Sequence, residues 1–437
     1  MAHDRPFRLL DLPPELVGQT CEHLADEDLR SVRQVSRALK IQSTSAYGQR
    51  FFDHLIVILH PTSLTIFLEI ARHPDLSKFV TRLSVSGERV RHSICPVKNQ
   101  AVHEDLQHSM ERSGADVTLL KEGLVALDNI NTVRIDKKQF YLGEGAANHY
   151  PGVACGRAHI LKDFSPFPKE DSHLEDGGHI RVYELTLKVL HDVDLLARVK
   201  LEFSFWTDVA DYPENQVAGY FDLGSEAWKI ASRNTHYVET FGGISIDWVS
   251  NILQDATDLH RLNLIYPTTY NQSRRTSRQY HAFSHNFQWR NLSHLRLEEV
   301  LTSHATFVTF LETHRETLDN IRFTSIGFQT GTWAEPLLII SGMSKLRVLL
   351  LDTLLERNNY PNPPLPDGVP DIDRSWLHAC NRNDVEQAMK ELCDKLATVP
   401  TKNWLVSGEG GECYLYMVDL RMAIAVTHGY WERAGEY

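Results

Sequence analysis

The chain has 437 residues, a formal net charge of -12 and six cysteines. This length exceeds what one ordinary hydrophobic core supports, so we expect several domains or a repeating, quasi-linear structure. The acidic balance argues against the dense basic surface of a nucleic-acid-binding protein, and we expect no nucleic-acid partner. The cysteines lack metal-site or disulfide spacing, and neither a signal peptide nor a membrane-length apolar run is present. These features predict an intracellular protein, cytoplasmic or nuclear, with no membrane span.

The densest set of helix signals lies in residues 9–41. Pro13 and the proline after it suit the first turn of a helix, where a missing N–H costs no hydrogen bond. Glu15 suits the positive end of the helix dipole, and Asp26 and Ser36 are candidate N-caps of a second and a third helix. The pattern predicts three short helices that share one apolar side, in a unit too small for a self-sufficient core. The other side is predicted to be wet and basic, from Arg30, Arg33, Arg37 and Lys40.

Several residues of this stretch match a known motif in order: Leu12-Pro13-x-Glu15-Leu16, Leu24, Asp28-Leu29 and Val35-Ser36-Arg37. Together they resemble the F-box, a helical motif that binds a Skp-type adaptor in cullin-based ubiquitin ligases. The sequence departs from the motif at Thr20, where an isoleucine or valine is usual, and at the preceding Gly18, which would lower adaptor affinity. An ordinary amphipathic helical hairpin is the alternative. The resemblance implies adaptor contacts by Leu12, Pro13, Leu16, Leu24, Leu29, Val32 and Val35.

A repeated template follows this stretch. A buried strand is predicted over residues 51–59 and an amphipathic helix over 62–73. The pattern apolar-x-x-apolar-x-apolar then recurs, with helical segments such as 303–315 between later copies. Its copies begin at Val80, Ile130, Val182, Leu259, Leu292, Leu318 and Leu346. The pattern resembles an irregular leucine-rich repeat, in which stacked strand and helix pairs share one long core. Buried strands of an ordinary α/β protein are the alternative.

The predicted fold class is therefore α/β. A small three-helix F-box over residues 1–48 would precede a leucine-rich-repeat-like solenoid over 49–437. Long loop insertions are expected near 143–180, 267–290 and 360–374, where glycine, proline or polar residues break the periodicity. A helix over residues 384–397 and a hairpin with a glycine-rich turn over 404–418 would cap the end of the solenoid.

No motif of an active site or metal site is present. The sequence has no HExxH, CxxC, P-loop or G-x-S-x-G motif, so we expect no catalytic residue, metal or cofactor. One basic, aromatic stretch over residues 268–290 stands out, because it contains no acidic residue. Its arginines would bind an acidic or phosphorylated degradation signal on a target protein. The alternatives are a solvated loop and a kinase phosphorylation site in the sequence SRRTS at 273–277. The candidate target-binding residues are Arg274, Arg275 and Arg278.

The sequence thus predicts a receptor without an active site. The resemblance implies the substrate-recognition subunit of an SCF-type (Skp, cullin, F-box) ubiquitin ligase, which binds a Skp-type adaptor, and cullin through it. The repeat domain would hold an unknown target protein. The alternatives are an F-box scaffold that does not promote ubiquitination, a plain repeat-type protein-interaction module, and an enzyme within residues 51–437.

Overall fold

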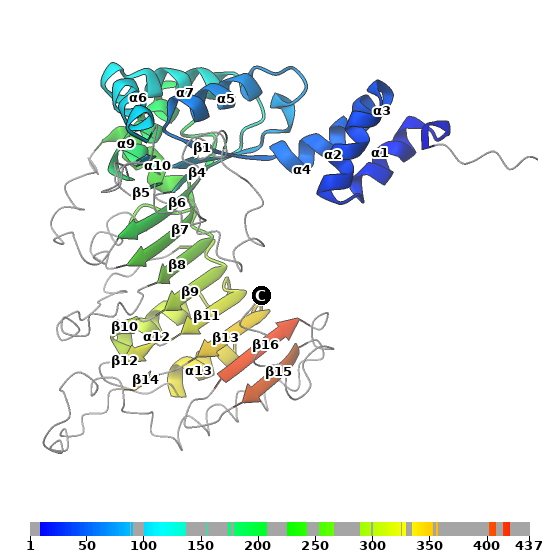
Figure 1. Cartoon of the computed structure of the whole chain (residues 1–437). Coiled ribbons are helices and arrows are strands. Elements are labelled where there is room, and N and C mark those ends of the chain that lie inside the picture. The colour runs from blue at the N-terminus through cyan, green and yellow to red at the C-terminus, as the bar shows by residue number, and fades with distance from the viewer. Residues whose placement is uncertain are drawn as a thin grey trace, which may run out of the picture. The chain divides into compact units, whose positions relative to one another are not determined.

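The chain divides into two compact units, Met1–Lys200 and Leu201–Tyr437, whose elements are labelled in Figure 1. The computed structural model describes residues 9–87, 89–90, 100–136, 155, 174–175, 179–207, 225–242, 253–265, 289–298, 300–324, 326–328, 334–352, 355–356, 402–407 and 414–419. The helix expected over 384–397 and the insertion expected near 360–374 lie outside these residues. The insertion expected near 267–290 is described only at its last two residues.

Short helices open the first unit. They are η1 (Leu9–Asp11), α1 (Pro14–Glu22), α2 (Asp26–Val35), α3 (Arg37–Gln42) and α4 (Thr44–Phe52). The predicted start of α1 is confirmed, and the Ser36 hydroxyl caps α3 by accepting a hydrogen bond from the Leu39 N–H at 3.2 Å. The prediction that Asp26 caps α2 is wrong. Asp26 lies inside the first turn of α2, where its carboxylate faces the helix dipole, and Ala25 takes the cap position without a side-chain bond.

The fourth helix was not predicted from the sequence. The predicted strand over 51–59 is wrong at its start, because Phe51 and Phe52 complete α4 and the strand β1 runs from His54 to Ile58. Tyr47 and Phe51 lie one helical turn apart, and their ring centroids are separated by 4.8 Å. Both rings therefore lie on the same side of α4. Helix α4 also runs across residue 48, the predicted end of the N-terminal domain.

Parallel strands β1, β2 (Arg82–Ser86) and β4 (Thr132–Asp136) follow in the first unit. Their register aligns Leu55 with Leu83 and Val133, so the predicted apolar template forms a buried row across the strands. Helices α5 (Pro61–Ala71), α6 (Gln100–Ser113) and α7 (Ala115–Val125) lie between the strands along the chain, and α5 confirms the helix predicted over 62–73. The short strands β3 (Arg89–Val90) and β5 (Leu174–Glu175) pair antiparallel.

The template beginning at Val182 is not a strand. Residues His179–Asp192 form helix α9, because Val182, Leu185 and Val189 also recur at helical spacing and are all buried. Of the insertion expected over 143–180, the structure describes Cys155, β5 and the first two residues of α9.

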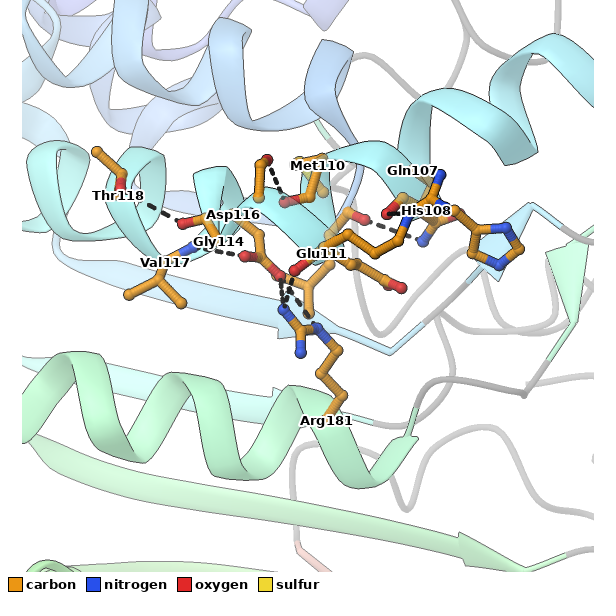
Figure 2. A network of polar contacts seen from close by, with 12 residues as sticks. Gln107, His108, Met110, Glu111, Gly114, Asp116, Val117, Thr118 and Arg181 are labelled. Carbon is orange, nitrogen blue, oxygen red and sulfur yellow. Dashed lines mark hydrogen bonds and ion pairs between the residues drawn. The ribbon is translucent and has the colours of Figure 1, made fainter.

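An ion pair with a buried carboxylate ties α9 to α7. Figure 2 shows Arg181 reaching from α9 to Asp116 in the first turn of α7. The Arg181 Nε and Nη2 atoms lie 3.0 and 2.5 Å from the Asp116 Oδ2 atom, whose side chain is completely buried. The other Asp116 oxygen accepts the Val117 N–H at 2.9 Å, so both oxygens of the buried carboxylate have partners.

The second unit is a sheet in the order β6-β7-β8-β9-β11-β13-β16-β15. Strands β6 to β13 pair in parallel. Their bounds are β6 Lys200–Thr207, β7 Thr235–Gly242, β8 Arg261–Ile265, β9 His294–Glu298, β11 Asn320–Thr324 and β13 Val348–Asp352. The antiparallel pair β15 (Lys402–Ser407) and β16 (Tyr414–Asp419) confirms the predicted pairing at the end of the chain, and β16 joins β13.

The predicted template aligns across the strands of this unit. Leu262, Leu295, Ile321 and Leu349 pair in one row, and Leu264, Leu297, Phe323 and Leu351 in the next. Helices α10 (Glu226–Arg233), α12 (His304–Thr313) and α13 (Ala334–Ser341) alternate with the strands, and a second parallel set joins β10 (Leu301–Thr302), β12 (Gly327–Phe328) and β14 (Leu355–Glu356). The predicted α/β class is thus confirmed. None of the helices in the described part of the chain combines the length and apolar character of a membrane span.

A candidate docking surface on the N-terminal helices

A small apolar core holds α1 to α4 together. Its buried members are Val17, Cys21, Leu29, Leu39 and Ala46, at least one from each helix. Burial raises the pKa of the Cys21 thiol, so this group stays protonated and serves as packing. Partly buried side chains pack against this core from its edge: Leu9, Leu12, Leu24, Val32, Tyr47 and Phe51.

An arginine from α4 closes the turn between α1 and α2. The Arg50 guanidinium donates to the carbonyl oxygen of Glu22 at 2.5 Å and to that of Leu24, and it lies 3.4 Å from the Asp26 carboxylate. The last carbonyls of a helix lack intrahelical donors, so this contact satisfies groups that α1 leaves open. Helix α4 is therefore part of the N-terminal helical unit, although the sequence analysis predicted only three helices there.

Of the four residues predicted to form a wet, basic side, Arg30, Arg37 and Lys40 are exposed, whereas Arg33 is half-buried. The Arg33 guanidinium lies 4.0 Å from the centre of the Tyr47 ring, and that of Arg30 lies 4.7 Å from the centre of the Phe51 ring. Arg33 also donates to the Lys40 carbonyl at 3.1 Å. The aromatic faces come from α4, and because a ring face attracts a cation, they draw these arginines onto the helices.

The seven residues predicted to contact an adaptor fall into three groups. Leu29 is completely buried in the helical core, so its side chain holds the helices together. Leu12, Leu24 and Val32 are half-buried and pack against that core. Pro13 is exposed, and the side chains of Leu16 and Val35 are exposed by 45% and 72%. The last group is open to a partner.

Two further exposed apolar side chains belong to the same helices. Leu10 is exposed by 45% and Ile41 by 66%, and the sequence analysis missed both because they flank the motif and match no fixed position in it. Half of the large apolar side chains exposed in the described part of the chain thus come from residues 10–41. Single exposed apolar residues are common, whereas several on one small unit are typical of a surface that binds another protein.

The two departures from the motif have defined surroundings. The Thr20 hydroxyl donates to the Leu16 carbonyl one turn earlier, at 2.7 Å, so its polar group is satisfied within α1. Gly18 is half-buried, and a methyl group in its place would lie 3.7 Å from the Gln42 carbonyl oxygen, an ordinary contact distance. Neither departure distorts α1.

The other predicted binding residues, Arg274, Arg275 and Arg278, lie outside the residues that the structure describes. Within the described ranges, no group of three His, Cys, Asp or Glu side chains is placed to hold a metal ion. The N-terminal surface carries apolar side chains, which bind by excluding water.

The chain matches no protein-family model and has no significant match among curated proteins.

Proposed function

We propose that the chain is the substrate-recognition subunit of an SCF-type ubiquitin ligase, acting in the cytoplasm or nucleus. Residues 1–52, to the end of α4, would be its F-box unit and bind a Skp-type adaptor, and through it cullin. The residues from 53 to 437 would form an irregular leucine-rich-repeat-like domain that holds a target protein. The order of motif residues from Leu12 to Arg37 is the basis of this proposal.

One observation carries the proposal beyond the motif. The N-terminal helices have a core of their own, and yet Leu16 and Val35, both at motif positions, are exposed. Fully burying a leucine or valine side chain contributes about 1.5–3 kcal/mol, and because Leu16 and Val35 are 45% and 72% exposed, an adaptor that covered both would gain about 2–3 kcal/mol. In the chain alone both side chains stay partly in water, so folding does not gain this free energy.

The alignment of apolar rows supports the proposed repeat domain. Strands β8, β9, β11 and β13 repeat one template in a common register, with α12 and α13 returning the chain between successive strands. Such a domain offers a broad surface to a target protein. Its contribution to ubiquitin transfer would be proximity, because fixing a target lysine beside the charged conjugating enzyme raises its effective concentration.

Co-purification with an adaptor tests the proposal. The full chain is mixed with purified Skp-type adaptor and cullin, and the complex is isolated on the adaptor. A Leu16→Asp, Val35→Asp variant should bind at least about 30-fold more weakly, the loss expected from a single hot-spot side chain. Val125→Asp is the matched control, because Val125 is 65% exposed but lies on α7. The proposal is refuted if the unchanged chain does not bind the adaptor, or if the two variants bind it equally well.

Ubiquitin transfer separates the receptor from the scaffold alternative. The reconstituted complex with cullin and a charged conjugating enzyme is supplied with proteins that co-purify with the chain. The receptor should increase their ubiquitination, and the Leu16→Asp, Val35→Asp variant should not. A chain that binds the adaptor and leaves every co-purifying protein unmodified would be a scaffold.

A further inference from the structure

The sheet of the second unit has two unlike faces. Alternate residues of its strands, among them Phe203 and Phe323, are buried on one face. Helices cover this face, since the Trp228 ring of α10 lies 5.9 Å from Phe203 and the Phe307 ring of α12 lies 5.4 Å from Phe323. The residues between them along each strand belong to the opposite face and are mainly polar and partly or fully accessible.

Three arginines lie close together on this polar face. Arg261 is in β8, Arg296 in β9 and Arg322 in β11. Arg296 pairs in register with Arg322, and Arg261 pairs with His294, two residues before Arg296. Because neighbouring strands lie about 4.8 Å apart, the Arg296 and Arg322 side chains leave the sheet side by side.

Only one of the three arginines has a carboxylate partner among the described residues. Arg296 contacts Glu298 through Nε at 2.6 Å and Nη2 at 2.5 Å. Arg261 and Arg322 are exposed and make no hydrogen bond or ion pair with any residue in the described ranges. Partial burial and the adjacent Arg296 lower the pKa of Arg322, while Glu298 raises it. Like charges opposite each other on neighbouring strands destabilise a sheet, and Arg296 and Arg322 are such a pair.

The nearby acids are engaged elsewhere. Glu239 of β7 accepts from Asn263 at 3.4 Å and from the Ser204 hydroxyl at 3.3 Å, and so faces β6 and β8. Asp319, just before β11, contacts Arg347 at 2.5 Å. Against the carboxylates of Glu239 and Glu298, the three arginines leave an excess of one positive charge on this part of a chain whose net charge is -12. That contrast indicates an anionic ligand.

We propose that this surface, defined by Arg261, Arg296 and Arg322, binds an acidic peptide segment of the recruited protein. A guanidinium fork holds a carboxylate through two parallel hydrogen bonds, and Arg261 and Arg322 each have a free fork. Nucleic acid fits this surface less well, because it needs a denser run of cations than three arginines provide. The inference rests on the proposed function for the source of the peptide.

Fluorescence anisotropy with the full chain tests the surface directly. The probes are a labelled oligo-glutamate peptide, an oligo-lysine peptide of equal length and a single-stranded RNA of the same charge as the oligo-glutamate. We expect the oligo-glutamate to bind, and added salt to weaken that binding. Arg261→Glu combined with Arg322→Glu should lower the affinity by about tenfold or more, since it removes two charge-assisted contacts.

The matched control makes the same charge change on the opposite layer. Lys229→Glu combined with Arg233→Glu alters two exposed residues of α10, which packs on the apolar face. Arg261→Gln combined with Arg322→Gln removes the charges without creating new repulsion and should also weaken binding. Tryptophan fluorescence reports folding of this unit, because Trp228 and Trp289 are buried there.

The outcomes are distinct. The acidic-peptide surface is refuted if the α10 control loses as much oligo-glutamate affinity as the arginine variants, if neither arginine variant loses affinity, or if RNA binds and oligo-glutamate does not.

Adaptor binding distinguishes this surface from the N-terminal one. The arginine variants should keep their adaptor binding. Loss of adaptor binding by Leu16→Asp, Val35→Asp with retained oligo-glutamate binding shows that the two sites are independent. An unchanged chain that binds oligo-glutamate and no adaptor refutes the proposed function alone.

Discussion

The N-terminal helices and the α/β region that follows them in the first unit place their polar groups differently. In α1 to α4 the buried side chains are apolar except Ser43, and the stabilising arginines Arg33 and Arg50 act from the edge of the core. In the region from β1 to α9 charged or titratable side chains are themselves buried, among them Asp116, Arg134, Asp136, His60 and His103.

This difference has physical consequences. Buried charges raise the cost of losing a single partner, because the remaining group is left without water or a counter-ion. The carboxylate beside Arg50 is 54% exposed, so water can solvate it when the arginine is removed and the loss costs less. The α/β region should therefore be sensitive to substitution and to pH at sites inside its core. The N-terminal helices should tolerate such changes and depend on their apolar core.

The largest expected effect comes from the ion pair between Arg181 and the buried Asp116 carboxylate. Arg181→Ala leaves the completely buried Asp116 carboxylate without its cation, and we expect a loss of about 3 kcal/mol. Arg50→Ala, in the N-terminal helices, should cost only about 1 kcal/mol, because its ion-pair partner Asp26 is 54% exposed. Hydrogen exchange of α7 and α4 at increasing urea measures both, since all eight tryptophans lie in the second unit.

Lys121→Ala is the control for this comparison. Lys121 on α7 and Asp192 on α9 are 4.0 Å apart and both partly exposed, so the same two helices carry an ion pair open to solvent. We expect a change below about 1 kcal/mol. If Arg181→Ala and Lys121→Ala had equal effects, burial of the first pair would not be what stabilises it.

The rows of apolar residues could be predicted from the sequence because each strand repeats one local pattern. The template leucines of β8, β9 and β11 align as expected, and the start of α1 and the cap of α3 follow from prolines and a serine with well-defined local roles. The stretch beginning at Val182 could not be assigned in this way. Its apolar residues fit a strand template and a helical period equally, and packing selects the helix.

No comparable local pattern in the sequence predicts the polar contacts. Arg181 and Asp116 are 65 residues apart in the sequence, and Arg296 and Arg322 are brought together only by the register of β9 and β11. At the docking surface, the motif selected seven residues but could not separate buried Leu29 from exposed Leu16. That separation requires α4, whose aromatic residues complete the helical core and carry no motif of their own.

A pH change tests whether the buried polar groups distinguish the two regions. His60 precedes α5, its Nδ1 accepts the Thr62 N–H, and burial lowers its pKa from 6.5 to about 4. The unfolded chain therefore binds the proton more readily, and the stability of this region should fall as the pH drops from 6.5 toward 4. His54 of β1 acts in the same direction, because burial lowers its pKa to about 4 as well. His23, the one histidine of residues 9–52, is exposed.

Hydrogen exchange at about pH 5.5 and pH 7.5, corrected for intrinsic rates, should show α5 opening more readily at the lower pH and α1 changing little. His60→Asn keeps an acceptor for the Thr62 N–H and removes the titrating group, so its α5 should depend less on pH. An α5 with the same pH dependence in this variant would assign the effect to other groups.

The smallest expected effect concerns the N-terminal helices alone. Gly18→Ala replaces a glycine in the middle of α1, and the added methyl group meets only the Gln42 carbonyl oxygen at 3.7 Å. We expect α1 to gain about 0.5–1 kcal/mol from the lower entropy of the unfolded chain. Gly48→Ala is the contrasting variant, since its methyl group would lie 2.1 Å from the Phe79 ring and should destabilise the unit.

Adaptor binding by the Gly18→Ala variant sharpens the assignment of the surface. Gly18 is half-buried beside the end of α3, whereas Leu16 and Val35 are exposed. If the adaptor binds through the exposed residues, slower exchange in α1 should accompany an unchanged affinity. A variant with a more stable α1 and a weakened complex would place Gly18 inside the interface, because only direct contact with the adaptor makes a stabilising methyl group harmful to binding.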